Sequence, residues 1–300
     1  MNMAKKKVAL IVVHGMGETP RNFDNALRAE LKGRLGSRFD ELHIGKVYYQ
    51  SILQVNESRV WKRVEKRLAG KWGLLRRLWW NDLRKFVLYG FGDAAGLENG
   101  KEGPGSVYTQ AQIIFAREML AACRAVGKDG PVVVLAQSLG GQVTSCYFWD
   151  AQQAVAKKHA QVGIWRDFDA FEKEITGEGS PITLEEKAFL QGASFRTFIT
   201  TGCNIPIFVA AHARAEILPI RPNDKFVWHN FYDQDDVLGW PLSDLSSEYA
   251  RVVTDYPINA SSGLYGLLVK SWNPRSHTEY WGDDDVLAAL EHQVRECMDM

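Results

Sequence analysis

The sequence lacks the features that assign a chain to a disulfide-rich, zinc-binding or nucleic-acid-binding class. Its four cysteines, Cys123, Cys146, Cys203 and Cys297, are far apart, and no CxxC pair occurs. This spacing predicts free thiols without a disulfide framework or a zinc site. Basic and acidic residues both number 36, so the formal net charge is zero. A general nucleic-acid binder carries a basic excess, so no nucleic-acid partner is expected.

Long hydrophobic runs are also missing. No apolar run approaches the ~18 residues of a membrane span. Three lysines and the six apolar residues Val8–Val13 stand near the N-terminus. This run is shorter than the about 7–15 residues of a signal-peptide core, so we expect a cytoplasmic protein. A chain of 300 residues buries roughly 75% of its unfolded surface and needs no metal or disulfide to fold.

Strand-like and helix-like segments alternate along most of the chain. Val8–Val13 and Pro131–Leu135 are apolar runs typical of strands that are buried on both faces. Further strands are predicted at 44–52, 195–201, 226–232 and 251–254. Helices are predicted at 23–35, 107–126, 140–159 and 283–295. This alternation predicts one α/β domain over residues 1–300, with a mostly parallel sheet and helices on both faces.

Two segments, about 53–105 and about 158–194, interrupt the alternation and are expected to be insertions. Within the first, residues 59–85 contain ten basic and two acidic residues, a local charge of +8, and four of the ten tryptophans. Val60 and Val64 begin a series of apolar residues near helical spacing. Such a segment could lie on an anionic membrane surface. The alternative is a lid helix whose apolar face packs on the body of the protein.

The most specific motif is Ala136-Gln-Ser138-Leu-Gly140, between an apolar run and a helical segment. A serine on a sharp strand-to-helix turn projects its hydroxyl away from the sheet, and small flanking residues are needed because strand and helix crowd together. The amide end of the following helix favours negative charge that develops at Ser138. In the alternative interpretation, the turn is ordinary and Ser138 only caps the helix.

The second motif, His14-Gly15-Met16-Gly17, directly follows the first predicted strand. Acyl transfer needs two N–H donors about 2.7–3.1 Å from the developing oxyanion. We assign these donors to the backbone amides of Met16 and Leu139, with the two glycines shaping the loop and His14 holding it by hydrogen bonds. In the alternative interpretation of this motif, the two glycines only shape a turn and the loop supplies no oxyanion donor. The third glycine of a dinucleotide-binding loop and any phosphate-binding P-loop are missing, so no cofactor is expected.

With these motifs, the sequence resembles the α/β-hydrolase superfamily, and most of all its serine esterase and lipase branch. The resemblance runs from Val8 to about the C-terminus, but only four short segments carry it. It implies an α/β-hydrolase fold and a catalytic triad in the chain order Ser, then Asp or Glu, then His. The acid and the base are therefore expected after Ser138.

Among the seven histidines, His277 fits the place that the resemblance implies for the general base. It lies in the polar stretch 273–280, after the apolar run 264–269 and before the last predicted helix. His14 and His43 precede the serine. The alternative is that His277 is an ordinary surface-loop histidine.

The triad acid has three candidates, Asp233, Asp235 and Asp236, which follow the predicted strand 226–232. Related hydrolases often show Asp, then one or two aliphatic residues, then Pro, and this favours Asp236. Asp235 and Asp233 remain alternatives, and the aspartates that are not catalytic are expected to cap the turn. Carboxylates also suit a divalent cation, but no glycine-spaced calcium loop is present, so no metal is expected.

These residues predict a serine hydrolase that cleaves carboxylic esters, with Ser138 as nucleophile, His277 as base and Asp236 as its orienting acid. The substrate would be a small-molecule ester or an acyl lipid, thioesters included, and the basic tryptophan-rich insertion favours the lipid. The alternative class is a non-catalytic module that binds a membrane surface or a protein through 59–85. Peptidase chemistry stays open, whereas epoxide hydrolases of this fold usually carry Asp at the position of Ser138. The sequence predicts no oligomeric state.

Overall fold

The computed structural model describes residues 6–68, 74–156, 158, 162–177, 179–259 and 280–300. Within them, the strands are β1 (Val8–Val13), β2 (Leu42–Val47), β3 (Val132–Gln137), β4 (Phe195–Thr201), β5 (Val227–Asp233) and β6 (Val253–Ile258). All pair in parallel in one sheet of order β2-β1-β3-β4-β5-β6. The main helices are α1 (Asn25–Leu35), α2 (Gln50–Leu68), α3 (Leu74–Glu98), α4 (Val107–Val126), α5 (Leu139–Val155), α6 (Phe168–Thr176), α7 (Leu184–Leu190), α8 (Ile205–Val209), α9 (Ser247–Val252) and α10 (Asp284–Met298).

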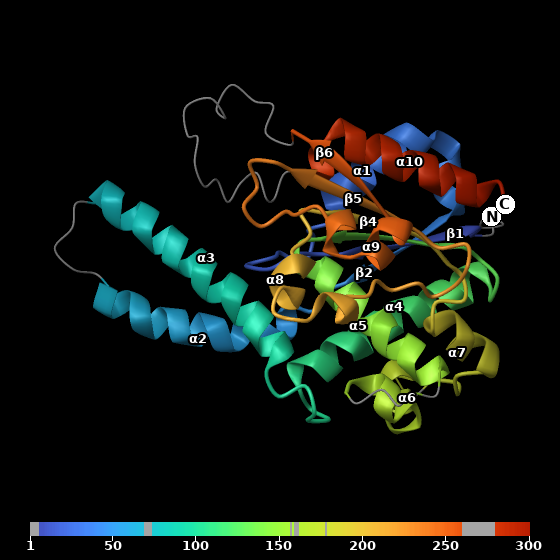
Figure 1. Ribbon diagram of the computed structural model, residues 1–300, viewed down its shortest axis with the longest axis horizontal. Coiled ribbons are helices and arrows are strands. Elements are labelled where there is room, and N and C mark those ends of the chain that lie inside the picture. The colour runs from blue at the N-terminus through green and yellow to red at the C-terminus, as the bar shows by residue number, and fades with distance from the viewer. Residues whose placement is uncertain (1–5, 69–73, 157, 159–161, 178, 260–279) are drawn as a thin grey trace.

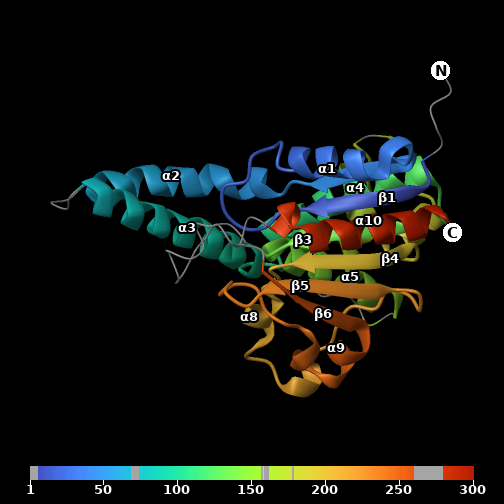
Figure 2. The ribbon, with the colours of Figure 1, turned by 90° about the horizontal axis from the view of Figure 1, so that it is seen from above.

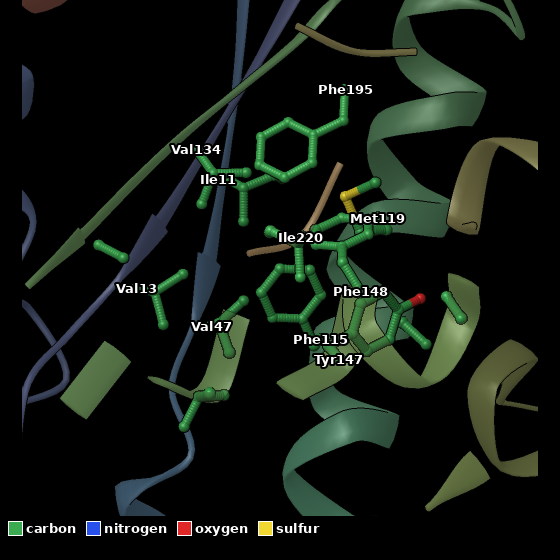
Figure 3. Packing of buried hydrophobic residues seen from close by; sticks show 14 of the residues in the cluster. Ile11, Val13, Val47, Phe115, Met119, Val134, Tyr147, Phe148, Phe195 and Ile220 are labelled. Carbon is green, nitrogen blue, oxygen red and sulfur yellow. The ribbon is translucent and has the colours of Figure 1, made fainter. Parts of the chain in front are cut away.

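The predicted fold class is confirmed, because the sheet is parallel and helices cover both of its faces (Figure 1). Every residue of β1 is fully buried, and its side chains alternate between the two faces. Ile11 and Val13 contribute to the core that α4 and α5 cover, shown in Figure 3. Leu10 and Val12 contribute to the core beneath α1 and α10. Each such side chain contributes about 1.5–3 kcal/mol by leaving water.

The two segments outside the alternation are helical in the structure. The first contains α2 and α3, which contact each other and extend away from the sheet (Figures 1 and 2). The second contains α6 and α7, which pack against α4. One of the two expectations for this segment was a helix whose apolar face packs on the body. On α2, Trp61 is buried, whereas Val60 is 46% and Val64 is 41% exposed. Helical spacing identifies an apolar face but does not say what covers it.

Two predicted strands differ from the structure by four or more residues at one end. The strand predicted at 44–52 is β2, which ends at Val47, because α2 begins at Gln50. The strand predicted at 251–254 is β6, which begins at Val253, because α9 occupies the preceding residues. The hydroxyl of Ser246 caps α9 by accepting a hydrogen bond from the Tyr249 amide. Among the described helices, none has the length and apolar character required to cross a bilayer.

Candidate active site

The strand order reverses its direction between β1 and β3. The chain leaves β1 towards β2 on one side of this point, whereas it leaves β3 towards β4 on the other side. Loops that diverge at the carboxyl ends of neighbouring parallel strands leave a space between them, and ligands of open α/β sheets bind there. The His14–Gly17 loop follows β1, and Ser138 follows β3. Both sequence motifs therefore lie at this point of the sheet edge.

Ser138 has the conformation of a sharp strand-to-helix turn. Its φ is 50° and its ψ is −122°, and it is the only non-glycine residue with positive φ in the described part of the chain. Such a backbone costs about 1–3 kcal/mol and persists only where the surroundings hold it. Here the Ser138 amide donates a 2.9 Å hydrogen bond to the Thr201 carbonyl at the end of β4.

The Ser138 hydroxyl does not cap the helix that it precedes. The side chain is 1% exposed, and Oγ has no hydrogen-bond partner among the described residues. Helix-capping serines have extended backbones and accept a hydrogen bond from an amide of the first helical turn. Ser138 differs on both counts, so its role in this turn is not that of an ordinary cap.

The His14–Gly17 loop lies directly against the Ser138 turn. A Cβ atom placed on Gly15 would lie 3.1 Å from Cβ of Ser138. A Cβ atom on Gly140 would lie 2.5 Å from the His14 carbonyl oxygen and 2.8 Å from that of Val13. Glycine is therefore needed at 140 for the two backbone segments to approach. The segments that carry the Met16 and Leu139 amides are thus in contact.

The His14 ring lies in an aromatic cluster beneath this loop. It stacks on Tyr49, with 4.1 Å between the ring centroids, and it also contacts Phe23 and Tyr48. Its Nδ1 is 2.7 Å from the Gly15 carbonyl oxygen. Burial lowers the pKa of His14 to about 4, so the ring is neutral near pH 7 and Nδ1 donates this bond.

The three candidate acids lie in different environments at the end of β5. Asp235 is exposed, whereas Asp233 and Asp236 are 2% and 6% exposed. Asp236 accepts a 2.9 Å hydrogen bond from the Leu238 amide and a 2.8 Å hydrogen bond from the Tyr280 hydroxyl. Asp233 accepts a bond from the Asp235 amide, and its own amide donates to Tyr280 Oη at 2.9 Å. His277, the predicted base, lies outside the described residues.

Two side chains that the sequence did not single out, Tyr49 and Asp93, bind the loop. Tyr49 Oη donates to the carbonyl oxygens of His14 and Gly15, at 2.9 and 3.1 Å. The Gly17 amide donates a 2.7 Å hydrogen bond to Oδ2 of Asp93, which is fully buried on α3. No local pattern marks a buried aspartate inside a long helix, so the sequence offered no signal for Asp93.

A groove of about 260 Å³ runs along α5 on the side of α8. Its wall includes Gln142, one helical turn after Ser138, and apolar residues of α8 such as Phe208. Within the described parts of the chain, no cluster of three or more His, Cys, Asp or Glu side chains could hold a metal ion.

No protein-family model matches the sequence, and no curated protein sequence matches it either. Among solved structures, the chain is similar to a candidate hydrolase of the α/β superfamily from Xanthomonas campestris pv. campestris. The two share 12% sequence identity over 95% of this chain and 98% of that chain, with a TM-score of 0.35. At this level of similarity the comparison assigns no residue of the site.

Proposed function

We propose that the protein is a serine hydrolase that cleaves carboxylic esters through an acyl-serine intermediate. The observation that carries the proposal is the backbone of Ser138, which combines a positive φ with a place between β3 and α5. This is the strand-turn-helix context in which a nucleophilic serine is exposed to substrate. The Ser138 hydroxyl, which has no hydrogen-bond partner within the described parts of the chain, and the adjoining His14–Gly17 loop support the same conclusion.

In the proposed reaction, Ser138 Oγ attacks the acyl carbon of the ester while its proton passes to His277. The carbonyl oxygen becomes an oxyanion, which the Met16 and Leu139 amides bind. When the tetrahedral intermediate collapses, the alcohol leaves with the proton from His277, and an acyl-serine remains. Water then attacks this acyl group with His277 again as base, so that the acid is released and Ser138 is restored.

Asp236 is proposed to orient the imidazole of His277 and to stabilise its protonated form. Its burial and its hydrogen bond from Tyr280 favour it over the exposed Asp235. His277 precedes Tyr280 by only three residues, and three extended residues span about 11 Å at most. The Tyr280 hydroxyl donates to Asp236, so this short connection along the chain supports the pairing of His277 with Asp236.

His14 is a poor alternative base. Its pKa of about 4 makes it a weak proton acceptor, since a general base works best when its pKa is near the operating pH. Its Nδ1 is engaged by Gly15, and its ring stacks on Tyr49. We therefore assign it to the support of the loop.

A fluorophosphonate probe tests the proposal, because it reacts covalently with activated serines. We expect wild-type protein to be labelled on the peptide that contains Ser138, and the Ser138→Ala variant to lose both labelling and hydrolysis of p-nitrophenyl esters. Ser180→Ala is the matched control, since Ser180 is exposed and does not line the groove along α5. Absence of labelling from folded wild-type protein would refute the hydrolase and favour a non-catalytic module.

A lipid-like substrate at an anionic membrane surface is the more specific proposal. Helices α2 and α3, here called the α2–α3 hairpin, extend away from the sheet (Figure 2), and the segment 59–85, with its charge of +8, includes residues of both helices. Exposed basic residues on a protruding helix attract anionic headgroups, and salt weakens this attraction. The exposed side chains of Arg59 and Arg63 belong to this surface.

Co-sedimentation with vesicles tests the membrane proposal separately. We expect binding to vesicles that contain phosphatidylserine, little binding to pure phosphatidylcholine, and release at high salt. The double variant Arg59→Glu, Arg63→Glu should bind less, whereas Arg221→Glu, an exposed arginine on the body, should not. Equal binding to both vesicle types would contradict an electrostatic surface, and no binding would contradict the membrane proposal.

A further inference from the structure

Residues 49–93 contact the whole of the His14–Gly17 loop. Tyr49 binds the carbonyl oxygens of its first two residues, and Asp93 binds the amide of its last. Met16 is contacted as well, because a Cβ atom on Gly90 would lie 2.7 Å from the Met16 Sδ atom. The position of the loop beside Ser138 therefore depends on the base of the α2–α3 hairpin.

The Asp93 carboxylate is held by neutral donors. It is fully buried, and besides the Gly17 amide it accepts a hydrogen bond from Gln50 Nε2, which is 3.3 Å from both oxygens. No described lysine or arginine forms an ion pair with it. The Gly17 amide lies 2.7 Å from Oδ2 of Asp93, a distance in the range of charge-assisted hydrogen bonds, which are stronger than bonds between neutral groups.

A second carboxyl group, Glu57 of α2, lies against the same turn of α3. A Cβ atom on Gly92 would lie 2.9 Å from Glu57 Oε1. The Glu57 oxygens are buried, and no described donor reaches either of them. Two buried carboxylates side by side repel each other, whereas one proton between them gives each group a partner. The arrangement thus fits one neutral and one charged carboxyl.

The surrounding charges agree with this distribution. Burial, and then the negative charge of Asp93, raise the pKa of Glu57 to about 9, and Glu18 adds to the effect. Lys85, on the same helix as Asp93, is paired with Glu18 at 2.6 Å. Burial also raises the pKa of Asp93, but the Gly17 amide opposes that rise. Because the Gly17 amide and Gln50 donate to Asp93, whereas no described donor reaches Glu57, a single proton is best placed on Glu57, and Asp93 then carries the charge that binds Gly17.

We propose that Asp93 is a positioning residue for the oxyanion loop, and that Glu57 supports it by sharing one proton with it. The proposal rests on the proposed hydrolase function, because the loop is taken to supply the Met16 amide to the oxyanion. Asp93 touches neither substrate nor Ser138, and it acts through Gly17. Its role gives the α2–α3 hairpin a direct mechanical connection to the catalytic edge of the sheet.

Two measurements on Asp93→Ala test the role of Asp93. Hydrogen exchange of the peptide that covers the loop is expected to become faster at pH 7, while β4 stays protected. The kcat for a p-nitrophenyl ester should fall about 10- to 10²-fold with KM little changed, since small misplacements of catalytic groups have effects of this size. Asp93→Asn should restore part of the rate, because its amide oxygen can still accept from Gly17.

The pH profile tests the shared proton. As the pH rises through about 9, the wild-type kcat should fall, and the wild-type loop should exchange faster than the loop of Glu57→Gln, because ionised Glu57 repels Asp93. Glu57→Gln cannot ionise and should lose this alkaline limb, with rates compared at equal pH. Ser58→Ala is the matched control on α2, since Ser58 accepts a bond from Tyr89 and does not reach the loop.

Each negative result has a distinct meaning. Unchanged loop exchange in Asp93→Ala would overturn the anchor, whatever the activity. Faster exchange with unchanged kcat in an active enzyme would overturn the positioning role. An alkaline limb that persists in Glu57→Gln would overturn the shared proton. If the wild type neither hydrolyses esters nor reacts with a fluorophosphonate, the proposed function fails and the positioning role fails with it, whereas the anchor is still judged by exchange.

Discussion

The Tyr280 hydroxyl donates a 2.8 Å hydrogen bond to Oδ2 of Asp236 and accepts a 2.9 Å hydrogen bond from the Asp233 amide. One buried hydroxyl therefore connects two of the three candidate acids. The third, Asp235, is exposed, and its amide caps the Asp233 carboxylate. The hydrogen bonds thus hold the end of β5 in one conformation in which the aspartates have different environments.

The first prediction distinguishes these aspartates. Asp236→Asn should lower kcat about 10³- to 10⁴-fold with little effect on KM, because the side-chain amide of the asparagine would favour the wrong tautomer of the His277 imidazole. Asp235→Asn, on the exposed neighbour, should stay within about twofold of wild type, since surface changes rarely matter. The measurement is steady-state hydrolysis of a p-nitrophenyl ester. A larger loss in Asp233→Asn than in Asp236→Asn would make Asp233 the acid.

The sequence predicted the parts of the site that have a local signal. The apolar run of β1 is followed directly by the glycine-rich His14–Gly17 loop, and that of β3 is followed by Ser138. Both turns lie at the carboxyl edge of the sheet. In a parallel sheet the carboxyl ends of all strands lie at this edge. Two motifs that each directly follow a predicted strand were therefore expected at the same edge.

Contacts between distant parts of the chain could not be predicted in this way. Asp93 is 76 positions from Gly17, and nothing in the residues around it shows that its carboxylate is buried. The run of aspartates after β5 likewise left three candidates, because only burial separates Asp235 from the others. Such features depend on packing that a periodic pattern does not encode.

The second prediction concerns the contact between the His14–Gly17 loop and the Ser138 turn. Gly140→Ala would place a methyl group 2.5 Å from the His14 carbonyl oxygen, so the loop must move away from Ser138. Overpacking of this kind costs about 1–3 kcal/mol in the free energy of unfolding, and displaced amides lower kcat. Urea denaturation and ester hydrolysis measure the two effects.

Gly33→Ala is the matched control for this substitution. Gly33 lies inside α1, and a Cβ atom there would meet nothing within 4 Å. Alanine at this helical position should raise the free energy of unfolding by about 0.5–1 kcal/mol and leave kcat unchanged. If Gly140→Ala behaved like Gly33→Ala, the contact between the loop and the serine turn would not constrain catalysis.

The third prediction uses the neutral, buried ring of His14. Its pKa is about 4 in the folded protein, against an ordinary 6.5. Between these values the unfolded chain binds a proton that the folded protein does not. The contribution of His14 to the free energy of unfolding is therefore fully present above pH 6.5 and is lost as the pH drops towards 4. The difference in pKa corresponds to about 3 kcal/mol at the acid end.

Comparison with His14→Asn isolates this contribution, because the carboxyl groups titrate in both proteins. Urea unfolding at pH 7.5 and at pH 4.5 should show a larger decrease for the wild type than for the variant, by about 2–3 kcal/mol. Asn at this position cannot take up a proton, so its remaining pH dependence comes from the other groups. Equal decreases in the two proteins would mean that His14 becomes protonated in the folded state, and that its ring is not held neutral by burial.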